Sequence, residues 1–323
     1  MGFKHLVILG AGSTIATIPQ GDKNGEKSYT LANLLSDPSL KSFVQKVQDK
    51  NYCTDDVEKL CNQLYKNDRN LYNEFETLIR KKYGSLELPM RFTILDRLVL
   101  SLTPNDAIIS FNWDDLIIQA YQRMSYFVPD KMLPILAFPH GNAQAVYSKT
   151  HYTSRRVITN DRNWLDSPLN MPVDEVDYKS NLFIKSQWRI LDFYIRNAKI
   201  ITFFGYRGPK SDEQDLLHLD ENFAKNKICD KIEIIDKDLR EAQIVAKNLE
   251  RFKMQQNWVY KCADFWHSSI AKYPRRTLRS LENNWNYTPK TSAKEETLLE
   301  FMGHVGPLIE KEQEELDRQA HNL

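Results

Sequence analysis

Short apolar segments recur along the chain, and stretches with a helical spacing of apolar residues separate them. Most of the segments are rich in branched aliphatic and aromatic residues, as strands buried on both faces of a sheet are. They cover residues 4–10, 107–110, 133–138, 198–204, 231–236 and 258–260. Because strands that alternate with helices pair in parallel, the pattern predicts an α/β fold built on a doubly wound parallel sheet.

Two longer helical stretches add to this alternation. Residues 30–101 carry apolar residues at helical spacing on three successive faces, which predicts a helical block inserted between the first two strands. Residues 276–323 are highly charged and mostly helical in pattern, and we expect a tail that serves assembly or a partner. The main domain then covers 1–275. Residues 143–174 lack a clear period, and we expect a loop or small subdomain there.

Asn112 follows the apolar segment Ala107–Ser110 and precedes a helix that Asp114 and Asp115 open. The two acidic residues lie where the helix dipole favours negative charge. Ligands of open α/β sheets bind at the carboxyl ends of the strands, which makes Asn112 a candidate site residue. An asparagine before a helix also serves as an N-cap. Local sequence alone leaves these two interpretations equal.

A glycine-rich turn, Gly-Ala-Gly-Ser-Thr at 10–14, follows the first predicted strand. Such a turn lets a backbone approach phosphates and presents amides at a helix start. The dinucleotide fingerprint Gly-x-Gly-x-x-Gly requires a third glycine, where this chain has Ile15. The turn therefore favours a nucleotide site over a plain structural turn, and it counts against an ordinary nicotinamide-dependent dehydrogenase.

Three further candidates follow later strands. His140 comes after the third predicted strand and before a glycine, which favours a site role although a lone histidine is more often structural. Gly205 and Tyr206 form a second glycine-marked turn after the strand at 198–204. Asp236 closes the next strand, where an acid either accepts hydrogen bonds from ribose hydroxyls or is an exposed strand end.

Composition excludes several functional classes. The formal net charge is +1 over 323 residues, so no general basic field predicts nucleic-acid binding. The four cysteines form no Cys-x-x-Cys pair, which argues against a structural zinc ribbon and a disulfide framework. No apolar stretch reaches membrane-spanning length and no signal-peptide pattern is present, so we expect a cytoplasmic protein without a membrane partner.

Four of these segments, taken in order, resemble the sirtuin-like family, and specifically its prokaryotic NAD-hydrolysing branch in antiphage defence systems. They are the turn at 10–14, Phe-Asn-Trp-Asp at 111–114, Pro-His-Gly-Asn at 139–142, and Gly-Tyr at 205–206 followed by Ser-Asp at 211–212. The resemblance covers roughly residues 5–270 and implies that 1–275 form a Rossmann-like, sirtuin-like NAD-binding catalytic domain.

The chain departs from the sirtuin deacylases at two places. Those enzymes continue from the glycine turn into Ile-Pro-Asp-Phe-Arg, whereas Ile18 and Pro19 are followed here by Gln-Gly-Asp. They also carry a four-cysteine zinc ribbon, which the cysteine spacing here does not provide. Deacylation of a protein is therefore disfavoured, while binding NAD⁺ and breaking its nicotinamide bond remain.

The resemblance also implies roles for individual residues. Asn112 and His140 would be catalytic, with Asn112 orienting water or ribose and His140 taking a proton. The residues expected to bind NAD⁺ are Gly10, Ala11, Gly12 and Ser13 through their amides, Asp114 at the nicotinamide riboside, and Gly205, Tyr206 and Asp236 toward the adenosine. No metal is expected.

The implied function is an NAD⁺ glycohydrolase that depletes cellular NAD⁺ during abortive infection. Because uncontrolled loss of NAD⁺ is toxic, we expect a homo-oligomer and a separate activating or sensing protein as partners. The product is either ADP-ribose or a cyclised form. The alternative is a catalytically silent module that senses NAD⁺ or a derivative, and a residual deacylase is a weaker third reading.

Overall fold

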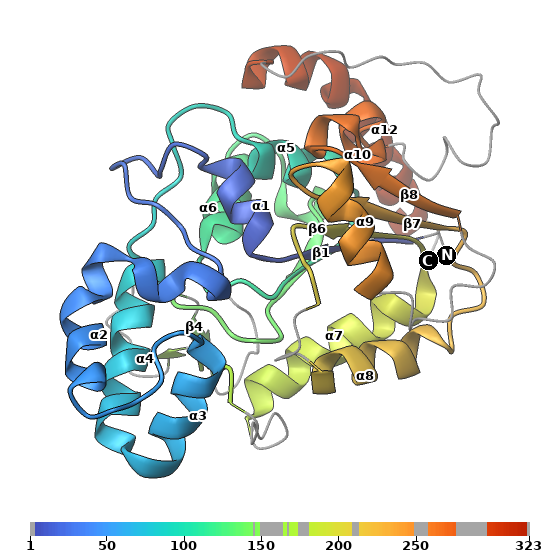
Figure 1. The fold of residues 1–323 in the computed structure, drawn as a ribbon. Helices are drawn as coiled ribbons and strands as arrows, with labels where there is room; N and C mark the ends of the chain where they lie inside the picture. The colour runs from blue at the N-terminus through green and yellow to red at the C-terminus, as the bar shows by residue number, and fades with distance from the viewer. Residues whose placement is uncertain are drawn as a thin grey trace.

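A six-stranded parallel sheet forms the centre of the computed structural model (Figure 1). The structure describes residues 4–144, 146–148, 164–166, 168–173, 181–208, 213–248, 258–275 and 296–321. The strands are β1 (Lys4–Leu9), β2 (Ala107–Ser110), β3 (Ile135–Ala137), β6 (Ala198–Phe204), β7 (Lys231–Ile235) and β8 (Trp258–Cys262). They lie in the order β3-β2-β1-β6-β7-β8, and each neighbouring pair is parallel. The predicted doubly wound parallel sheet is confirmed.

The register brings the carboxyl ends of the central strands to one edge. Leu9, the last residue of β1, pairs with Ser110 of β2 and with Phe204 of β6. The alignment continues beyond the strands, since the Phe111 amide donates to Leu9 O and the Gly10 amide donates to Phe204 O. The segments that follow these three strands therefore meet at one place.

Alternating side chains of β1 belong to two separate apolar cores, as the pleat of a strand requires. Leu6 and Ile8 pack with α7 (Leu182–Asn197), α8 (Glu213–Phe223) and α9 (Leu239–Asn248). Val7 and Leu9 belong to the core on the other face. That core includes apolar residues of α5 (Ile94–Ser101), α6 (Leu116–Ser125) and α10 (Ser269–Lys272). Burial on both faces explains the continuous apolar runs of the sequence.

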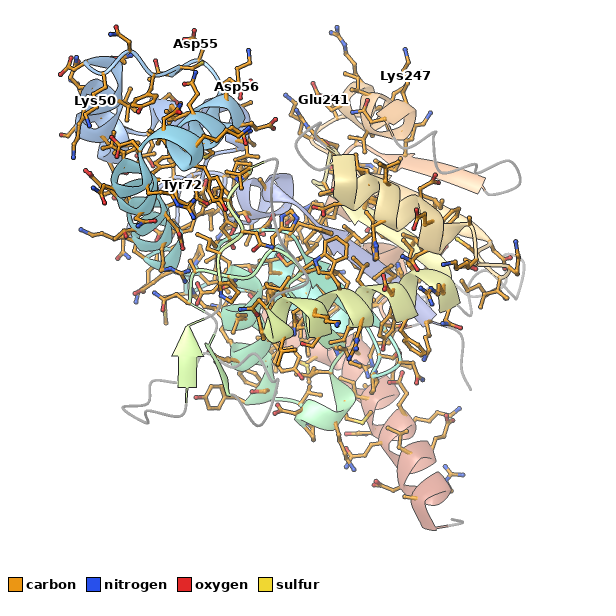
Figure 2. All side chains as sticks on the ribbon, turned by 90° about the horizontal axis from the view of Figure 1, so that it is seen from below. Lys50, Asp55, Asp56, Tyr72, Glu241 and Lys247 are labelled. Atoms are coloured by element: carbon orange, nitrogen blue, oxygen red, sulfur yellow. The ribbon has the colours of Figure 1, made fainter. Side chains whose placement is uncertain are left out.

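The helices over residues 30–101 lie between α1 (Ala11–Thr17) and β2. They are η1 (Leu31–Ser36), η2 (Pro38–Leu40), α2 (Lys41–Gln48), α3 (Val57–Asn67), α4 (Arg69–Gly84) and α5. Figure 1 shows α2–α4 beside the sheet, and Lys50, Asp55 and Asp56 lie at their outer end in Figure 2. Asp56 caps α3 by accepting from the amides of Glu58 and Lys59.

The C-terminal helix α12 (Leu298–His321) packs on the main body through its first half. Phe301, Val305 and Ile309 are buried there, at the spacing of one helix face. Its later turns are mostly exposed and extend away from the sheet in Figure 2. Arg275 reaches this helix, with its Nε donating to Glu312 Oε2 at 3.0 Å.

Several predicted elements differ in extent from the observed ones. The strand predicted over 133–138 is limited to β3, because Leu133 still belongs to the end of a 3-10 helix, η3 (Asp130–Met132). Leu133 is the C-cap residue of η3, and its amide donates to Asp130 O. The helix predicted after Asp264 is divided into η5 (Phe265–His267) and α10, since Ser268 caps a new helix. Of the loop predicted over 143–174, the described part includes the antiparallel pair β4 (Val146–Ser148) and β5 (Trp164–Asp166).

Other predicted segments lie outside the described residues. They are the start of the helix predicted from 176, the helix cap at 211–212, the end of the helix predicted to 252, and residues 276–295 of the tail. None of the helices within the described ranges is long and apolar enough to cross a membrane.

A buried histidine near the amino end of β1 makes the stability of the protein depend on pH. His5 is fully buried, its Nε2 lies 2.8 Å from Thr202 Oγ1, and its amide donates to Asp106. Burial lowers the pKa of His5 from 6.5 to about 3. Between pH 3 and 6.5, the unfolded chain therefore binds a proton at His5 that the folded protein does not bind. The free energy of unfolding is fully available above pH 6.5 and falls as the pH drops toward 3.

We expect the free energy of unfolding of a His5→Gln protein to fall less steeply with decreasing pH than that of wild type. The difference in slope is up to about 1.4 kcal/mol for each pH unit. Urea unfolding at several pH values between 4 and 6.5 measures it. Asp106 is a second source of pH dependence and is present in both proteins, because burial raises its pKa to about 6. Its contribution has the opposite sign and is lost as the pH rises from about 4 to 6. Parallel pH profiles for wild type and the His5 variant would contradict the prediction.

Candidate active site

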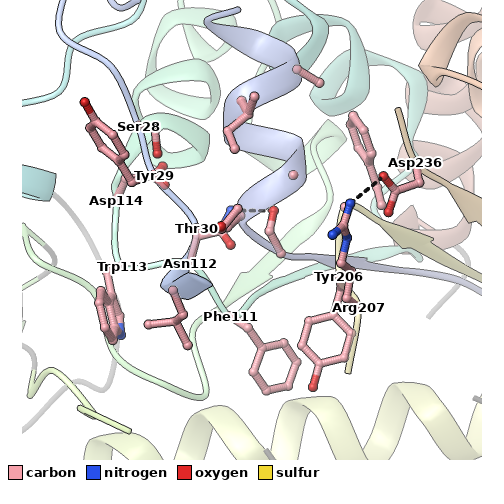
Figure 3. Close-up of a pocket in the computed structure, with 18 of the residues that line it drawn as sticks. Ser28, Tyr29, Thr30, Phe111, Asn112, Trp113, Asp114, Tyr206, Arg207 and Asp236 are labelled. Atoms are coloured by element: carbon pink, nitrogen blue, oxygen red, sulfur yellow. Dashed lines mark hydrogen bonds and ion pairs between the residues drawn. The ribbon is translucent and has the colours of Figure 1, made fainter. Parts of the chain in front are cut away.

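A cavity of about 720 Å³ lies at the carboxyl edge of the sheet, where the strand order reverses between β1 and β6. Doubly wound sheets bind their ligands at such a switch point, and the volume suits a ligand larger than a single nucleotide base. Figure 3 shows Trp113 and Tyr29 toward one end and Arg207 with Asp236 toward the other. The lining thus reaches from the residues after β2 and β3 to those after β7 and β8.

The structure brings nearly all of the predicted site residues together around this cavity. The lining includes Gly10, Ala11, Gly12, Asn112, Asp114, His140, Gly205, Tyr206 and Asp236. Ser13 lies behind the lining and is buried, with its hydroxyl donating to Gly10 O at 2.8 Å. Ser13 therefore supports the turn from inside.

Three glycines interlock where β1 and β6 end. The Gly12 amide donates to Gly205 O at 3.0 Å, and Gly205 has a φ of +63°. A Cβ atom on Gly10 would lie 2.6 Å from Gly205 O, and one on Gly12 would lie 2.7 Å from Gly205 Cα. Only glycine fits these positions. The close approach that a third fingerprint glycine normally permits is made here by Gly205, while Ile15 lines the cavity.

The amides of the turn are mostly used within the protein. The N–H groups of Gly10, Gly12 and Ser13 donate to Phe204 O, Gly205 O and Gly10 O. The end of β6 and its turn thus occupy the amides of Gly10 and Gly12, and the Ser13 amide bonds within its own turn. The contact of residues 10–13 with a phosphate stays a prediction. Ala11, the first residue of α1, lines the cavity and is the position at which this prediction is best supported.

The side chain of Asn112 is held in one orientation. Its Nδ2 donates to Gly10 O at 3.1 Å, to Thr14 Oγ1 at 3.0 Å and to Ser13 Oγ at 3.3 Å. Gly10 O only accepts, so the nitrogen must face α1 and the two ends of the amide are assigned without ambiguity. Among the described residues none donates to Asn112 Oδ1, which leaves this acceptor for the cavity.

The structure excludes one of the two interpretations of Asn112, that of a helix cap. The helix that follows has Asp115 as its N-cap residue, and the Leu116 amide donates to Asp114 Oδ1. The helix start is thus served by Asp114, and the capping role considered for Asn112 is wrong. Asn112 instead joins the end of β2 to the glycine turn after β1.

Asp114 is a buried acid beside Asn112. Its Oδ2 accepts from Thr14 Oγ1 at 2.7 Å, and its backbone carbonyl accepts from Asn142 Nδ2 at 2.5 Å. Burial raises the pKa of Asp114, while the Thr14 hydroxyl opposes this shift. The residue therefore places a carboxyl group with a raised pKa in the wall of the cavity, near Trp113 and Tyr83.

His140 enters the cavity from the end of β3, through a turn in which Gly141 has a φ of 74°. The His140 carbonyl accepts from the Asn170 amide at 2.9 Å, which ties the turn to residues 168–173. The imidazole packs edge-on against Phe111, with ring centroids 4.7 Å apart. The predicted histidine is thus set in a rigid wall of the cavity.

Asp236 is predicted to bind the adenosine part of NAD⁺, and the end of the cavity at which it lies is polar. The Asp236 side chain is only 6% exposed and lies 3.5 Å from Arg207 Nη2, which is 2.8 Å from Glu241 Oε2 (Figure 3). The alternative reading of Asp236 as an exposed strand end is wrong, because Arg207 covers it. A carboxylate at such a strand end is able to accept hydrogen bonds from ribose hydroxyls, so the contact of Asp236 with the adenosine stays a prediction.

Several residues of the site escaped the sequence reasoning. Tyr29, Tyr83 and Arg207 line the cavity, and Asp215 of α8 lies 2.5 Å from His140. Nothing in the sequence separates Asp215 from the other acids of its helix. The Gly-Tyr-Arg order at 205–207 was the one signal available for Arg207. Within the described part of the chain, no group of three or more metal-ligating side chains comes together.

Comparisons with known proteins show distant likenesses of structure. No family model and no curated protein matches the sequence. A Sir2 homologue in an ADP-ribose complex, with serine replaced by alanine, aligns over 78% of this chain and 92% of its own at 11% identity and a TM-score of 0.36. A structure from work on sirtuin substrate affinity aligns over 86% and 93% at 13% identity and a TM-score of 0.36. The fold class of this chain rests on its own strand order and register.

Proposed function

We propose that the protein is an NAD⁺ glycohydrolase that breaks the bond between nicotinamide and ribose. The observation that carries the proposal is the amide of Asn112, whose nitrogen is bound to α1 and whose oxygen is left for the cavity. A fixed acceptor suits a reaction in which positive charge develops on the substrate. The resemblance of the ordered motifs to those of the sirtuin-like family and the volume of the cavity support NAD⁺ as the ligand.

The residues of the cavity suit each part of the reaction. The nicotinamide nitrogen leaves with the bonding electron pair, and C1′ of the ribose becomes an oxocarbenium-like centre. Asn112 Oδ1 orients the ribose or the attacking water, and Asp114 faces the nicotinamide riboside. His140 takes a proton as the water attacks. The products are nicotinamide, ADP-ribose and a proton, with no metal required.

The proposal extends to the role of this activity in the cell. Depletion of NAD⁺ would serve antiphage defence by abortive infection, as in the defence systems that the motifs resemble. Such an enzyme has to be inactive until infection. We propose that assembly of several copies or a separate sensing protein activates it, with α2–α4 and the exposed half of α12 as the contact surfaces.

Nicotinamide release from NAD⁺, followed by liquid chromatography over a range of protein concentrations, tests the proposal. Wild type is expected to release nicotinamide, and His140→Ala is expected to lower kcat on the order of 100-fold or more. If wild type is silent, the assay is repeated with the protein encoded beside it. Silence there too, with NAD⁺ binding measured by calorimetry, would favour the NAD⁺-sensing module.

A further inference from the structure

Asp215 is a buried acid without a part in the reaction described so far, and it lies against His140. It belongs to the first turn of α8, and its Oδ2 is 2.5 Å from His140 Nε2. The side chains are 4% and 12% exposed. An ionised carboxylate buried to this extent is costly unless it is paired and hydrogen-bonded. The imidazole of His140 provides that pairing.

The aromatic ring of Phe111 packs against His140 and is itself in contact with two further rings. Phe111 meets His140 edge to face at 88°, and its ring centroid also lies 5.1 Å from that of Tyr206 and 5.9 Å from that of Trp188. Phe111 thus covers part of the imidazole, and both side chains of the pair are nearly buried. Because the local dielectric constant is low, the interaction between His140 and Asp215 is stronger than it would be in water.

The pair also determines which imidazole nitrogen carries the proton. An ionised carboxylate only accepts hydrogen bonds, so His140 Nε2 donates to Asp215 and Nδ1 keeps the lone pair. The nitrogen with the lone pair is the one that takes a proton from water. The carboxylate on the opposite side then stabilises the imidazolium that forms, as the buried acid of a catalytic triad does.

We propose that Asp215 is a positioning residue, which holds His140 in the tautomer and orientation required for proton transfer from the attacking water. This inference rests on the proposed hydrolysis of NAD⁺. The bond from nicotinamide to C1′ breaks with its electron pair on nicotinamide, and the water oxygen bonds to C1′. The water proton passes to His140 Nδ1 and then to solvent. Asp215 stays ionised and contacts neither the substrate nor the water.

A second histidine–carboxylate pair lies close by and offers a matched control. His218 follows Asp215 by one turn of α8, and its Nε2 is 2.6 Å from Asp192 Oδ1 on α7. The bond to Asp192 raises the pKa of His218, and the charges of Glu221 and Asp215 act in the same direction. Neither His218 nor Asp192 is among the described residues that line the cavity. An Asp192→Asn protein therefore removes an equivalent carboxylate away from the site.

The first experiment follows the imidazole of His140 by NMR, in protein whose seven histidines carry a ¹³C label. A His140→Ala protein identifies the resonance. In Asp215→Asn, the His140 ring is expected to titrate at a lower pH, because its imidazolium loses the carboxylate. In Asp192→Asn, the His140 titration is expected to stay in place while that of His218 moves. An unchanged His140 titration in Asp215→Asn overturns the proposal.

The second experiment measures steady-state cleavage of NAD⁺ against pH. Asp215→Asn is expected to lower kcat on the order of 100-fold with little change in KM, and to move the acid limb of the pH profile downward. In a His140→Ala background, the same substitution is expected to change kcat little, because the two residues act as a unit. Asp192→Asn is expected to keep the wild-type kcat. Full additivity of the two losses overturns the proposal.

Thermal unfolding shows whether Asp215→Asn is folded. If it is not, Asp215→Glu replaces it, since this variant keeps the charge and displaces the carboxylate by one methylene. Its kcat is expected between those of wild type and His140→Ala, and a wild-type kcat overturns the proposal. A wild type that cleaves no NAD⁺ contradicts the proposed function itself, and the NMR titration then still decides whether Asp215 controls His140.

Discussion

An Asn112→Ala protein is expected to release nicotinamide from NAD⁺ at least about 100-fold more slowly than wild type. The substitution removes the acceptor Oδ1 from the cavity, so the ribose and the attacking water lose their fixed partner. It also removes the donor that joins Gly10 O and Thr14 Oγ1 to the end of β2. Steady-state assays of kcat and KM, together with thermal unfolding, separate the two losses.

Asn226 offers a matched control for the structural part of this effect. Its Nδ2 donates to Ile195 O and Ala198 O, both at 2.8 Å, near the amino end of β6 and away from the cavity. Asn226→Ala is expected to lower the unfolding temperature while kcat stays at the wild-type value. Unchanged turnover in Asn112→Ala would show that this asparagine has no part in the reaction.

A Gly205→Ala protein is expected to lose about 3 kcal/mol or more of unfolding free energy, and with it the affinity for NAD⁺. Gly205 has a φ of +63°, which strains any side chain. A Cβ atom there would also lie 2.2 Å from the Ser13 amide nitrogen and 2.4 Å from Gly12 C. The two turns would have to separate. Urea unfolding and calorimetric titration with NAD⁺ measure the two losses.

Two other glycines separate the causes of this loss. Gly25 has a φ of +83° but open space around its Cβ position, so Gly25→Ala is expected to cost only about 1–2 kcal/mol of backbone strain. Gly303 lies inside α12 with open space, and Gly303→Ala is expected to stabilise by about 0.5–1 kcal/mol. A Gly205→Ala protein no less stable than Gly25→Ala would show that the interlocked turns tolerate a side chain.

The sheet was predictable from the sequence because each strand carries its own local signal. The segments Ala107–Ser110 and Ala198–Phe204 are strands at the predicted bounds, since polar or turn residues border continuous apolar runs. The third strand was predicted too long, because the turn of η3 precedes it and a run of apolar residues does not reveal a 3-10 turn. The periodicity of apolar residues depends only on neighbours along the chain.

The partners of the site residues were beyond the reach of that signal. Asn112 binds Gly10 and Thr14, which are 102 and 98 residues away in the chain, and His140 meets Asp215 at a separation of 75 residues. A local reading therefore left Asn112 equally placed as a helix cap and as a site residue. The structure excludes the helix cap, because Asp115 is the N-cap residue of α6 and the Asn112 amide binds Gly10 and Thr14. The site role of Asn112 stays a prediction.

The sequence by itself determined the alternation of strands and helices, the glycine turn and the polar residues at the strand ends. Each depends on properties of adjacent residues, such as burial on both faces or the freedom of glycine. Only the tertiary structure decided the strand order, the pairing of Gly205 with the first turn and the contact between His140 and Asp215. Parallel strands far apart in the chain bring these groups to one edge, and no local pattern records which strands become neighbours.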